Sequence, residues 1–340
     1  ALVIGRDGGE ALGLLQIHPR RAADTDLGSR IAHCAGSAYL QAGHVTWAER
    51  WFDRCRRTAS VPSATASQAR ADTGTALLHL HQGRLSDADA AALRALEQLQ
   101  RSMDTDVLCT LTQVRVAVFR MQGRYSQAIA VLRDHGADLE ASEAPRLAVA
   151  THLARAEVEL DLGRLGWAQD AVEQALSGMT GRDQTHQQLR IAILQARIHL
   201  QAGLVGLALE SLPRLVHRAR RAGIMRLARQ AATTLARAHA HNGEPVPARS
   251  LVDGVLAETT GTGDALGLID IRRDELRGLS TLFQPDPVVA ALSGWPELPG
   301  AYAVQLDMHR ARLQWASSQL CDPEPARKDA RAVASIIQQN

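Results

Sequence analysis

The segment "LGRLGWAQDAVEQAL", residues 162–176, predicts the end of one helix, a turn at Gly163 and the start of a second helix. Its apolar residues return every three or four positions, the spacing that gives an α-helix one apolar face. Glycine suits the turn because it adopts the left-handed backbone conformation that ends many helices. The fold depends on whether this hairpin occurs once or is repeated.

The turn glycine recurs at a constant interval of 40 residues; the step from Gly43 to Gly83, for example, is 83 − 43 = 40. The six copies are Gly43, Gly83, Gly123, Gly163, Gly203 and Gly243. Alanine stands five positions after each glycine, at Ala48, Ala88, Ala128, Ala168, Ala208 and Ala248. Small or apolar residues also stand seven positions before and nine positions after it, as Gly36 and Phe52 do in the first copy. We expect these to be packing positions where two helices approach closely.

A helical hairpin of this kind cannot cover its own apolar face, so neighbouring copies must stack and share one core. The composition agrees, because Ala, Leu and Arg favour helices and aromatic residues supply only 3% of the 340 residues. The pattern therefore predicts an all-α protein.

These residues resemble the tetratricopeptide repeat (TPR) family. "GSAYLQAGHVTWAERWF", residues 36–52, supplies Gly36, Tyr39, Ala48 and Phe52 at the family's positions, and "FRMQGRYSQAIAVL", residues 119–132, matches in part. The period of 40 exceeds the family's usual 34, the first-helix Trp is absent, and the closing Pro is generally missing. Such long repeats resemble the sensor and scaffold regions of large bacterial signalling and transcription regulators.

The resemblance implies a right-handed α-solenoid of TPR-like helical hairpins, forming one superhelical domain over residues 1–340. We expect a partial N-terminal repeat at 1–20, six regular 40-residue repeats at 21–262, and irregular C-terminal repeats with a cap at 263–340. In this last part Pro285, Pro287, Pro296 and Pro299 leave room for only a short second helix.

The resemblance also implies that the first helices line a concave groove that binds peptides. Positions two, six and ten before each turn glycine share one helical face. The candidate groove residues are His33, Ser37, Leu77, His81, Gln113, Met121, Glu157, Arg190, Arg197, Arg237, Arg273 and Arg277.

Arg197, Arg237 and Arg277 form an arginine ladder in the C-terminal half of this groove. One interpretation is a site for an acidic or phosphorylated peptide or a small anion, since guanidinium groups bind carboxylate and phosphate bidentately. The alternative is that the protein neutralises the ladder itself. In that case Glu157 and Asp161 pair with Arg197, while Asp274 and Glu275 balance Arg273 and Arg277.

Leu77, Leu80, Ala117 and Met121 in the N-terminal half of the groove have two interpretations. One is an apolar patch flanked by His33 and His81. It suits an apolar side chain of a peptide or a partner helix. The alternative, which we favour, is that these residues, Leu80 above all, belong to the core.

Several function classes have no support in the sequence. The formal charge of +2 gives no global field toward nucleic acid or membrane. The basic runs at 54–57 and 217–221 suit the carbonyl ends of helices, with phosphate contact as the alternative. The four cysteines lack CxxC spacing, and no metal, nucleophile or phosphate-loop motif is present. We therefore predict no enzyme activity, no cofactor and no metal.

The sequence thus predicts a non-catalytic module that binds a peptide, a partner protein or a small anionic ligand in its groove. The resemblance implies the sensor or scaffold part of a larger bacterial regulator, and the scattered cysteines favour a cytoplasmic protein. Because the chain does not begin with Met, we expect it to be a piece of that longer protein. The alternative is a free-standing scaffold or chaperone-like adaptor. Nucleic-acid binding through the basic helix ends is less favoured.

Overall fold

The computed structural model describes residues 26–58, 65–99, 104–140, 144–179, 185–280, 282–295, 297, 301–318 and 323–338. Within these ranges the chain forms sixteen helices and no strand, which confirms the predicted all-α class. The expected partial repeat at 1–20 lies outside the described residues, as do Pro296, Pro299 and Cys321.

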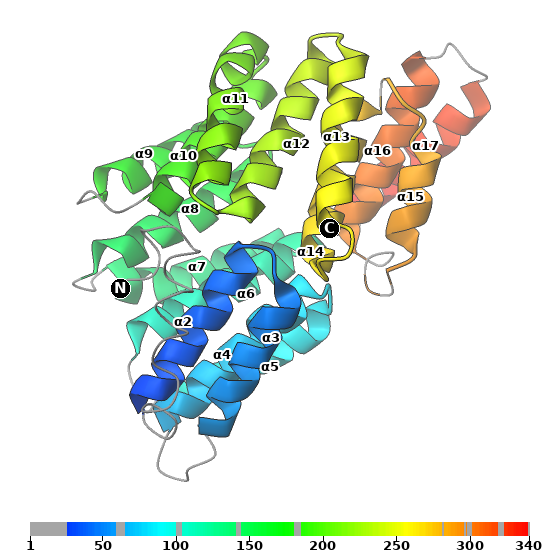
Figure 1. Cartoon of the computed structure of the whole chain (residues 1–340). Helices are drawn as coiled ribbons and strands as arrows, with labels where there is room; N and C mark the ends of the chain where they lie inside the picture. Colours follow the sequence, from blue (N-terminus) through cyan, green and yellow to red (C-terminus); the bar gives the residue numbers. More distant parts are fainter. Residues whose placement is uncertain are drawn as a thin grey trace.

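The helices alternate between two roles within successive hairpins (Figure 1). The first helices are α2 (Asp26–Gln41), α4 (Thr65–His81), α6 (Thr105–Gln122), α8 (Pro145–Asp161), α10 (Thr185–Gln201), α12 (Met225–His241), α14 (Ala265–Leu279) and α16 (Tyr302–Ser318). The second helices are α3 (Val45–Thr58), α5 (Leu85–Leu99), α7 (Tyr125–Glu140), α9 (Leu165–Ser177), α11 (Val205–Arg221), α13 (Pro245–Thr259), α15 (Asp286–Ser293) and α17 (Pro323–Gln338).

The predicted turn glycines end the first helices in the left-handed conformation. Gly123 is representative, with φ of 74° and an N–H that donates to the carbonyl of Arg120 at 3.1 Å. The following amide, of Arg124, donates to the carbonyl of Phe119 at 2.8 Å. These bonds satisfy carbonyls that the helix end would otherwise leave unpaired, and they fix the direction in which the second helix starts.

The predicted packing positions are confirmed. The alanine five residues after each turn glycine is fully buried in all six copies, with 0% exposure. In the first copy the ring of Phe52, also 0% exposed, lies against Gly36 of α2 and Gly74 of α4. A Cβ at Gly36 would stand 2.7 Å from Phe52 Cδ1, and one at Gly74 would stand 2.8 Å from Phe52 Cγ. The close helix approach therefore depends on the missing side chains.

The hairpins stack in chain order, and the C-terminal hairpins then pack against the N-terminal ones. Successive helices pack on one another from α2 to α15, and α16 packs on α14 and α17. In addition α14 contacts α4, and α16 contacts α6 (Figure 1). One apolar core joins Leu111 and Val114 of α6 to Ile269 and Leu276 of α14. The solenoid of helical hairpins therefore closes into a compact superhelix, in which residues about two hundred positions apart share a core.

The C-terminal part is irregular, as expected. After α14, the helix α15 has only 8 residues. Pro287 at its start fits the first helical turn, where no backbone donor is needed. We call the N-terminal hairpins the first coil of the superhelix, and the C-terminal hairpins that return over them the second coil. Trp295, just after α15, packs on the core that joins these two coils and lies against Gly83. The short helix thus lets the chain fold back over the N-terminal hairpins.

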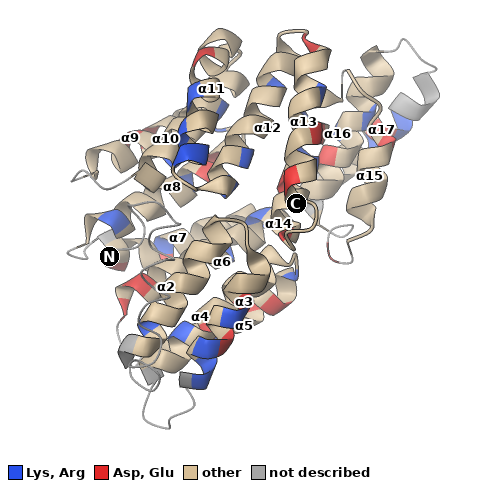
Figure 2. Ribbon diagram, in the orientation of Figure 1, with Lys and Arg blue, Asp and Glu red and all other residues tan. Residues whose placement is uncertain are grey.

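Basic and acidic residues are mixed over the helices (Figure 2). No helix of the described chain is long and apolar enough to cross a membrane.

Candidate functional site

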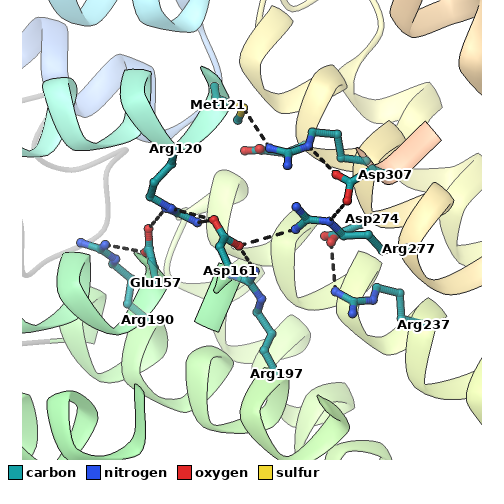
Figure 3. A network of polar contacts seen from close by, with 12 residues as sticks. Arg120, Met121, Glu157, Asp161, Arg190, Arg197, Arg237, Asp274, Arg277 and Asp307 are labelled. Carbon is teal, nitrogen blue, oxygen red and sulfur yellow. Dashed lines mark hydrogen bonds and ion pairs between the residues drawn. The ribbon is translucent and has the colours of Figure 1, made fainter. Parts of the chain in front are cut away.

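Charged side chains from six successive first helices meet in one set of contacts on the inner side of the superhelix (Figure 3). We call this set the inner network. Its members are Arg120, Met121, Glu157, Asp161, Arg190, Arg197, Arg237, Arg273, Asp274, Arg277 and Asp307. They come from α6, α8, α10, α12, α14 and α16.

Glu157 and Asp161 of α8 are the acidic residues on one side of the network. Arg120 donates to Asp161 Oδ2 from Nε at 2.9 Å and also pairs with Glu157, which accepts from Arg190 at 2.7 Å. Burial alone would raise the pKa of Glu157, but Arg190 and Arg120 lower that pKa to about 2. Burial would likewise raise the pKa of Asp161, and Arg120 and Arg277 hold it well below its usual range. Both carboxylates are therefore ionised at neutral pH.

Asp307 of α16 is the acidic residue on the other side. Its two carboxylate oxygens accept from Arg273 Nε and Arg277 Nε, both at 2.9 Å. Arg273 also reaches Met121 Sδ of α6 at 3.4 Å, so this group bridges the two coils of the superhelix. Arg277 Nη1 lies 3.6 Å from Asp161 Oδ1, which joins α14 to α8 three hairpins earlier. These contacts make the two sides one continuous network.

Arg237 of α12 enters the network across α14. It donates to Asp274 Oδ1 at 3.1 Å, and Asp274 also accepts from Thr233 at 3.2 Å. A Cβ at Gly278 would stand 2.9 Å from Arg237 Cβ. The absence of a side chain at Gly278 is therefore what lets Arg237 lie along α14.

The network contains more basic than acidic groups. Six guanidiniums face four carboxylates, so the formal charge of the network is 6 − 4 = +2. Three of its buried donor atoms have no hydrogen-bond partner among the described residues: Arg197 Nε, Arg237 Nε and Arg273 Nη2. An arrangement of this kind can bind a group with acceptor oxygens.

A second polar cluster fastens the two coils at the start of α14. Asp264, fully buried, accepts from Arg229 Nη2 of α12 at 2.9 Å and from the ring of His81 of α4 at 3.1 Å. Burial lowers the pKa of His81 even though Asp264 raises it, so the ring is neutral. Its Nδ1–H donates to Asp264, and its Nε2 accepts from Arg226 at 3.3 Å. We call Asp264, His81, Arg226 and Arg229 the coil clasp.

The candidate residues separate into three groups. The inner network contains Met121, Glu157, Arg190, Arg197, Arg237, Arg273 and Arg277. His81 belongs to the coil clasp. Within the described part of the chain, four candidates lie outside the network: His33, Ser37, Leu77 and Gln113.

The four remaining candidates have local surroundings. The ring of His33 lies 5.9 Å from that of Phe52. Gln113 donates to Cys109 Sγ at 3.3 Å within α6. Leu77 packs against the core, and Ser37 is half-buried on α2.

The interpretation of these residues as an open apolar patch is wrong. Leu80 and Met121 are buried, and Leu77 and Ala117 pack against the core that they share with α14, α15 and α16. The returning coil covers the inner faces of α4 and α6, so this patch is not available to a ligand. The alternative, that these residues are core, is confirmed.

The position ten residues before the turn glycine also does not face a groove in the middle hairpins. Leu153 and Ile193 stand at this position, and they are buried in the cores beneath α8 and α10, with 0% and 1% exposure. Four-residue steps drift around a helix because a helical turn contains 3.6 residues. The drift turns this position toward the neighbouring helices.

The protein does supply carboxylates to the arginine ladder; the expected pair of Asp161 with Arg197 is present, and the other pairs differ from those expected. Asp161 pairs with Arg197 and Asp274 pairs with Arg237. Glu275 pairs with Arg249 and Arg272, away from the ladder. The carboxylate of Arg273 and Arg277 is Asp307, in the irregular C-terminal part that the repeat pattern does not align.

Sequence reasoning missed Arg120, Asp264 and Asp307. Arg120 stands three residues before Gly123, outside the face chosen by four-residue steps. Asp264 carried a signal, because an aspartate directly before a helix is a typical N-cap. Its side chain accepts from the amide of Gly267 at 3.0 Å. The repeat offered no corresponding signal for Asp307.

The basic runs at second-helix ends have protein partners. Arg56 pairs with Asp53 at 3.1 Å, and Arg54 lies over the ring of Trp51. Arg218 donates to Gln188, and Arg220 pairs with Glu258. The described residues contain no group of three or more His, Cys, Asp or Glu side chains arranged for a metal ion.

Comparison with known proteins gives matches in structure only. No protein-family model matches the chain, and no curated protein matches it. A Rap protein complexed with competence and sporulation factor has a TM-score of 0.69 and 13% sequence identity, over 98% of this chain and 93% of that chain. The Rap conjugation gene regulator of plasmid pLS20, in complex with the Phr* peptide, has a TM-score of 0.61 and 11% identity, over 97% and 96%. At these identities the likeness shows a shared fold.

Proposed function

We propose that this chain is a non-catalytic peptide-binding module that serves as the sensor or scaffold part of a bacterial signalling or transcription regulator. The observation that carries the proposal is the inner network, in which six successive first helices direct polar side chains to one region. A peptide presents carbonyl and carboxylate oxygens along its length. Guanidinium groups, which only donate, bind such acceptors with defined geometry.

The shared fold supports the same proposal. One neighbour in structure was solved with a peptide and the other with competence and sporulation factor, and both are matched over nearly their whole length. Fold alone does not determine function, so the residues of this chain must supply the specificity. The network supplies it by placing six arginines where the first helices converge.

Peptide binding would act by shifting the balance between arrangements of the superhelix. The inner network joins α8 to α14, and the coil clasp joins α4 to α12 and α14. A ligand changes such an equilibrium only through different affinities for the two arrangements. A peptide that takes over one partner of Arg277 or Arg273 meets this condition, because those side chains also hold α14 to α8 and α6.

The test is affinity selection from a pool of synthetic hexapeptides. We expect enrichment of a defined subset on the folded protein and none on the heat-unfolded protein. At one hundred times its Kd, an enriched peptide should stabilise the fold by about 2.7 kcal/mol. Absence of enrichment on the folded protein would refute the proposal.

Hydrogen exchange then locates the bound peptide. We expect slower exchange in α10, α12 and α14 and little change in the second helices α9 and α11. Trp167→Ala serves as the matched control, because Trp167 of α9 is 59% exposed and lies outside the inner network. This variant should bind the same peptides with unchanged affinity, and slower exchange confined to second helices would contradict an inner site.

A further inference from the structure

We propose that Arg197 and Arg237, on neighbouring first helices, form a subsite for an acidic side chain, aspartate or glutamate, of the bound peptide. This inference rests on the proposed function and adds the charge of the residue that the site selects. Its basis is an imbalance within the inner network: Arg120 and Arg190 leave no buried donor without a partner, whereas Arg197 and Arg237 each leave a buried Nε without a partner among the described residues.

Arg197 is the clearest case. Its side chain is only 8% exposed, and its guanidinium makes no hydrogen bond to any described residue. Its ion pair with Asp161 spans 3.9 Å from Nη2 to Oδ1, which is beyond hydrogen-bond distance. Asp161 is already engaged, because its Oδ2 accepts from Arg120 Nε at 2.9 Å. The buried Nε–H of Arg197 has no acceptor among the described residues. An unpaired buried donor is costly to keep, so it signals a missing acceptor.

Arg237 has a similar deficit. Its one hydrogen bond to a carboxylate among the described residues goes to Asp274 at 3.1 Å, and its buried Nε has no partner there. Burial lowers the pKa of Arg237; Asp274 opposes that effect, and the positive charges of Arg197 and Arg277 add to it. Arg237 therefore has one carboxylate partner, Asp274, while two further guanidiniums lie close enough to act on its charge.

Arg120 and Arg190, the arginines on the opposite side of the network, differ in this respect. Arg120 donates to both Glu157 and Asp161, and these carboxylates hold its pKa above the usual range despite burial. Arg190 donates to Glu157 at 2.7 Å. An incoming anion would have to displace a carboxylate there, whereas at Arg197 and Arg237 it adds one.

The spacing of the pair fits one carboxylate. Arg197 and Arg237 occupy the same position in successive hairpins, six residues before the turn glycine. Packed neighbouring helices lie about 8–10 Å apart, a distance that two arginine side chains directed toward the same point can bridge. Arg273 Nη2, also buried and without a partner in the described chain, belongs to the same network. One acidic side chain lowers the formal excess of the network from +2 to +1.

The experiment uses hexapeptide pools that are identical except at one fixed position, which carries either Glu or Gln. We expect the wild-type protein to retain at least one Glu pool about tenfold more strongly than the matching Gln pool, the effect of about one charge-assisted hydrogen bond. Arg197→Gln and Arg237→Gln should reduce this preference to about twofold or less while still retaining the Gln pool.

Arg115→Gln is the matched control. Arg115 lies on first helix α6 and pairs with Asp89 at 2.9 Å, outside the inner network, so its replacement should preserve the preference for Glu. Equal retention of Glu and Gln pools by the wild type would overturn this inference and leave the peptide-binding function standing. Retention of neither pool would overturn both.

Stability without any peptide gives a second measurement. Arg197→Met removes a buried charge that has no hydrogen-bonded partner, so the unfolding midpoint should stay the same or rise. Arg120→Met removes the partner of Glu157 and Asp161, so the midpoint should fall. If Arg197→Met lowers the midpoint as much as Arg120→Met does, Arg197 is a structural residue and the subsite assignment is wrong.

Discussion

Replacement of Asp264 by alanine should open the superhelix at one defined place. Asp264 is fully buried before α14, where it binds Arg229 at 2.9 Å and His81 at 3.1 Å. It also caps α14 by accepting from the amide of Gly267 at 3.0 Å. The single change therefore removes an ion pair, a bond between coils and a helix cap.

The magnitude follows from what Arg229 loses. Without Asp264, its remaining hydrogen bond within the described chain is to Thr259 Oγ1 at 3.4 Å, although its side chain is only 6% exposed. Leaving one partner of a buried ion pair uncompensated costs about 3–5 kcal/mol. Loss of the cap adds about 1 kcal/mol. Asp264→Asn retains a capping oxygen, so it should avoid most of the second cost.

Asp104→Ala provides the matched control. Asp104 caps α6 through the amide of Val107 at 3.3 Å and pairs with Arg70 at 2.9 Å, but Arg70 lies on the adjacent first helix α4. Removing Asp104 therefore removes a cap and an arginine partner without breaking a bond between the two coils. Its side chain is 23% exposed, so we expect a smaller loss of stability.

The assay combines urea unfolding with hydrogen exchange. Asp264→Ala should lower the free energy of unfolding by about 4–6 kcal/mol and should speed exchange at the C-terminal end of α4, next to His81. Asp104→Ala should leave that end of α4 protected. If the two variants lose equal stability and exchange at α4 is unchanged in both, the coil clasp does not hold the coils together.

Three further predictions concern packing and pH. Gly36→Ala should lower the free energy of unfolding by about 1–2 kcal/mol, because overpacking against Phe52 exceeds the gain in helix propensity. Gly254→Ala should raise the free energy of unfolding by up to about 1 kcal/mol, since nothing lies within 4 Å of its Cβ position. Urea titrations of both variants check these two expectations. The pKa of Glu157 is lowered from 4.5 to about 2, so the stability that this carboxylate contributes is present above pH 4.5 and falls by about 3 kcal/mol as the pH drops toward 2. In Glu157→Gln the free energy of unfolding should fall less steeply over that pH range. A fall as steep as in the wild type would contradict the pairing of Glu157 with its arginines. Burial lowers the pKa of His33 from 6.5 to about 4, so the unfolded chain binds a proton at a higher pH than the folded chain does. The free energy of unfolding should therefore decline by up to about 3 kcal/mol as the pH falls from 6.5 to 4. His33→Gln should lessen that decline, as measured by unfolding at a series of pH values.

The hairpins were predictable because their signals are local. A glycine that must take φ near 74° and an alanine at a 0% exposed contact are each required by two adjacent helices, so both recur wherever the hairpin recurs. The position six residues before the turn glycine was also predictable, since it placed Glu157, Arg197 and Arg237 on one face. All three belong to the inner network.

The contacts between coils were not predictable in this way. The meeting of α14 with α4 depends on small rotations that accumulate over five hairpins, and no single hairpin encodes their sum. Leu77 and Met121 therefore appeared to face an open groove, whereas the returning coil covers them. Asp307 was missed for the same reason, because it reaches the arginines from a segment outside the regular pattern.

The inner network is difficult to explain as a device for stability alone. Buried ion pairs contribute little net stability even when complete, and apolar residues of similar volume often do better. The ion pair of Arg197 is not hydrogen-bonded, since its guanidinium lies 3.9 Å from Asp161, a carboxylate that already accepts a hydrogen bond from Arg120. Groups that cost stability in the free protein are common where a ligand binds, because the ligand supplies what the protein leaves out. The unpaired donors on α10 and α12 are thus stronger evidence for a bound acidic group than the number of arginines.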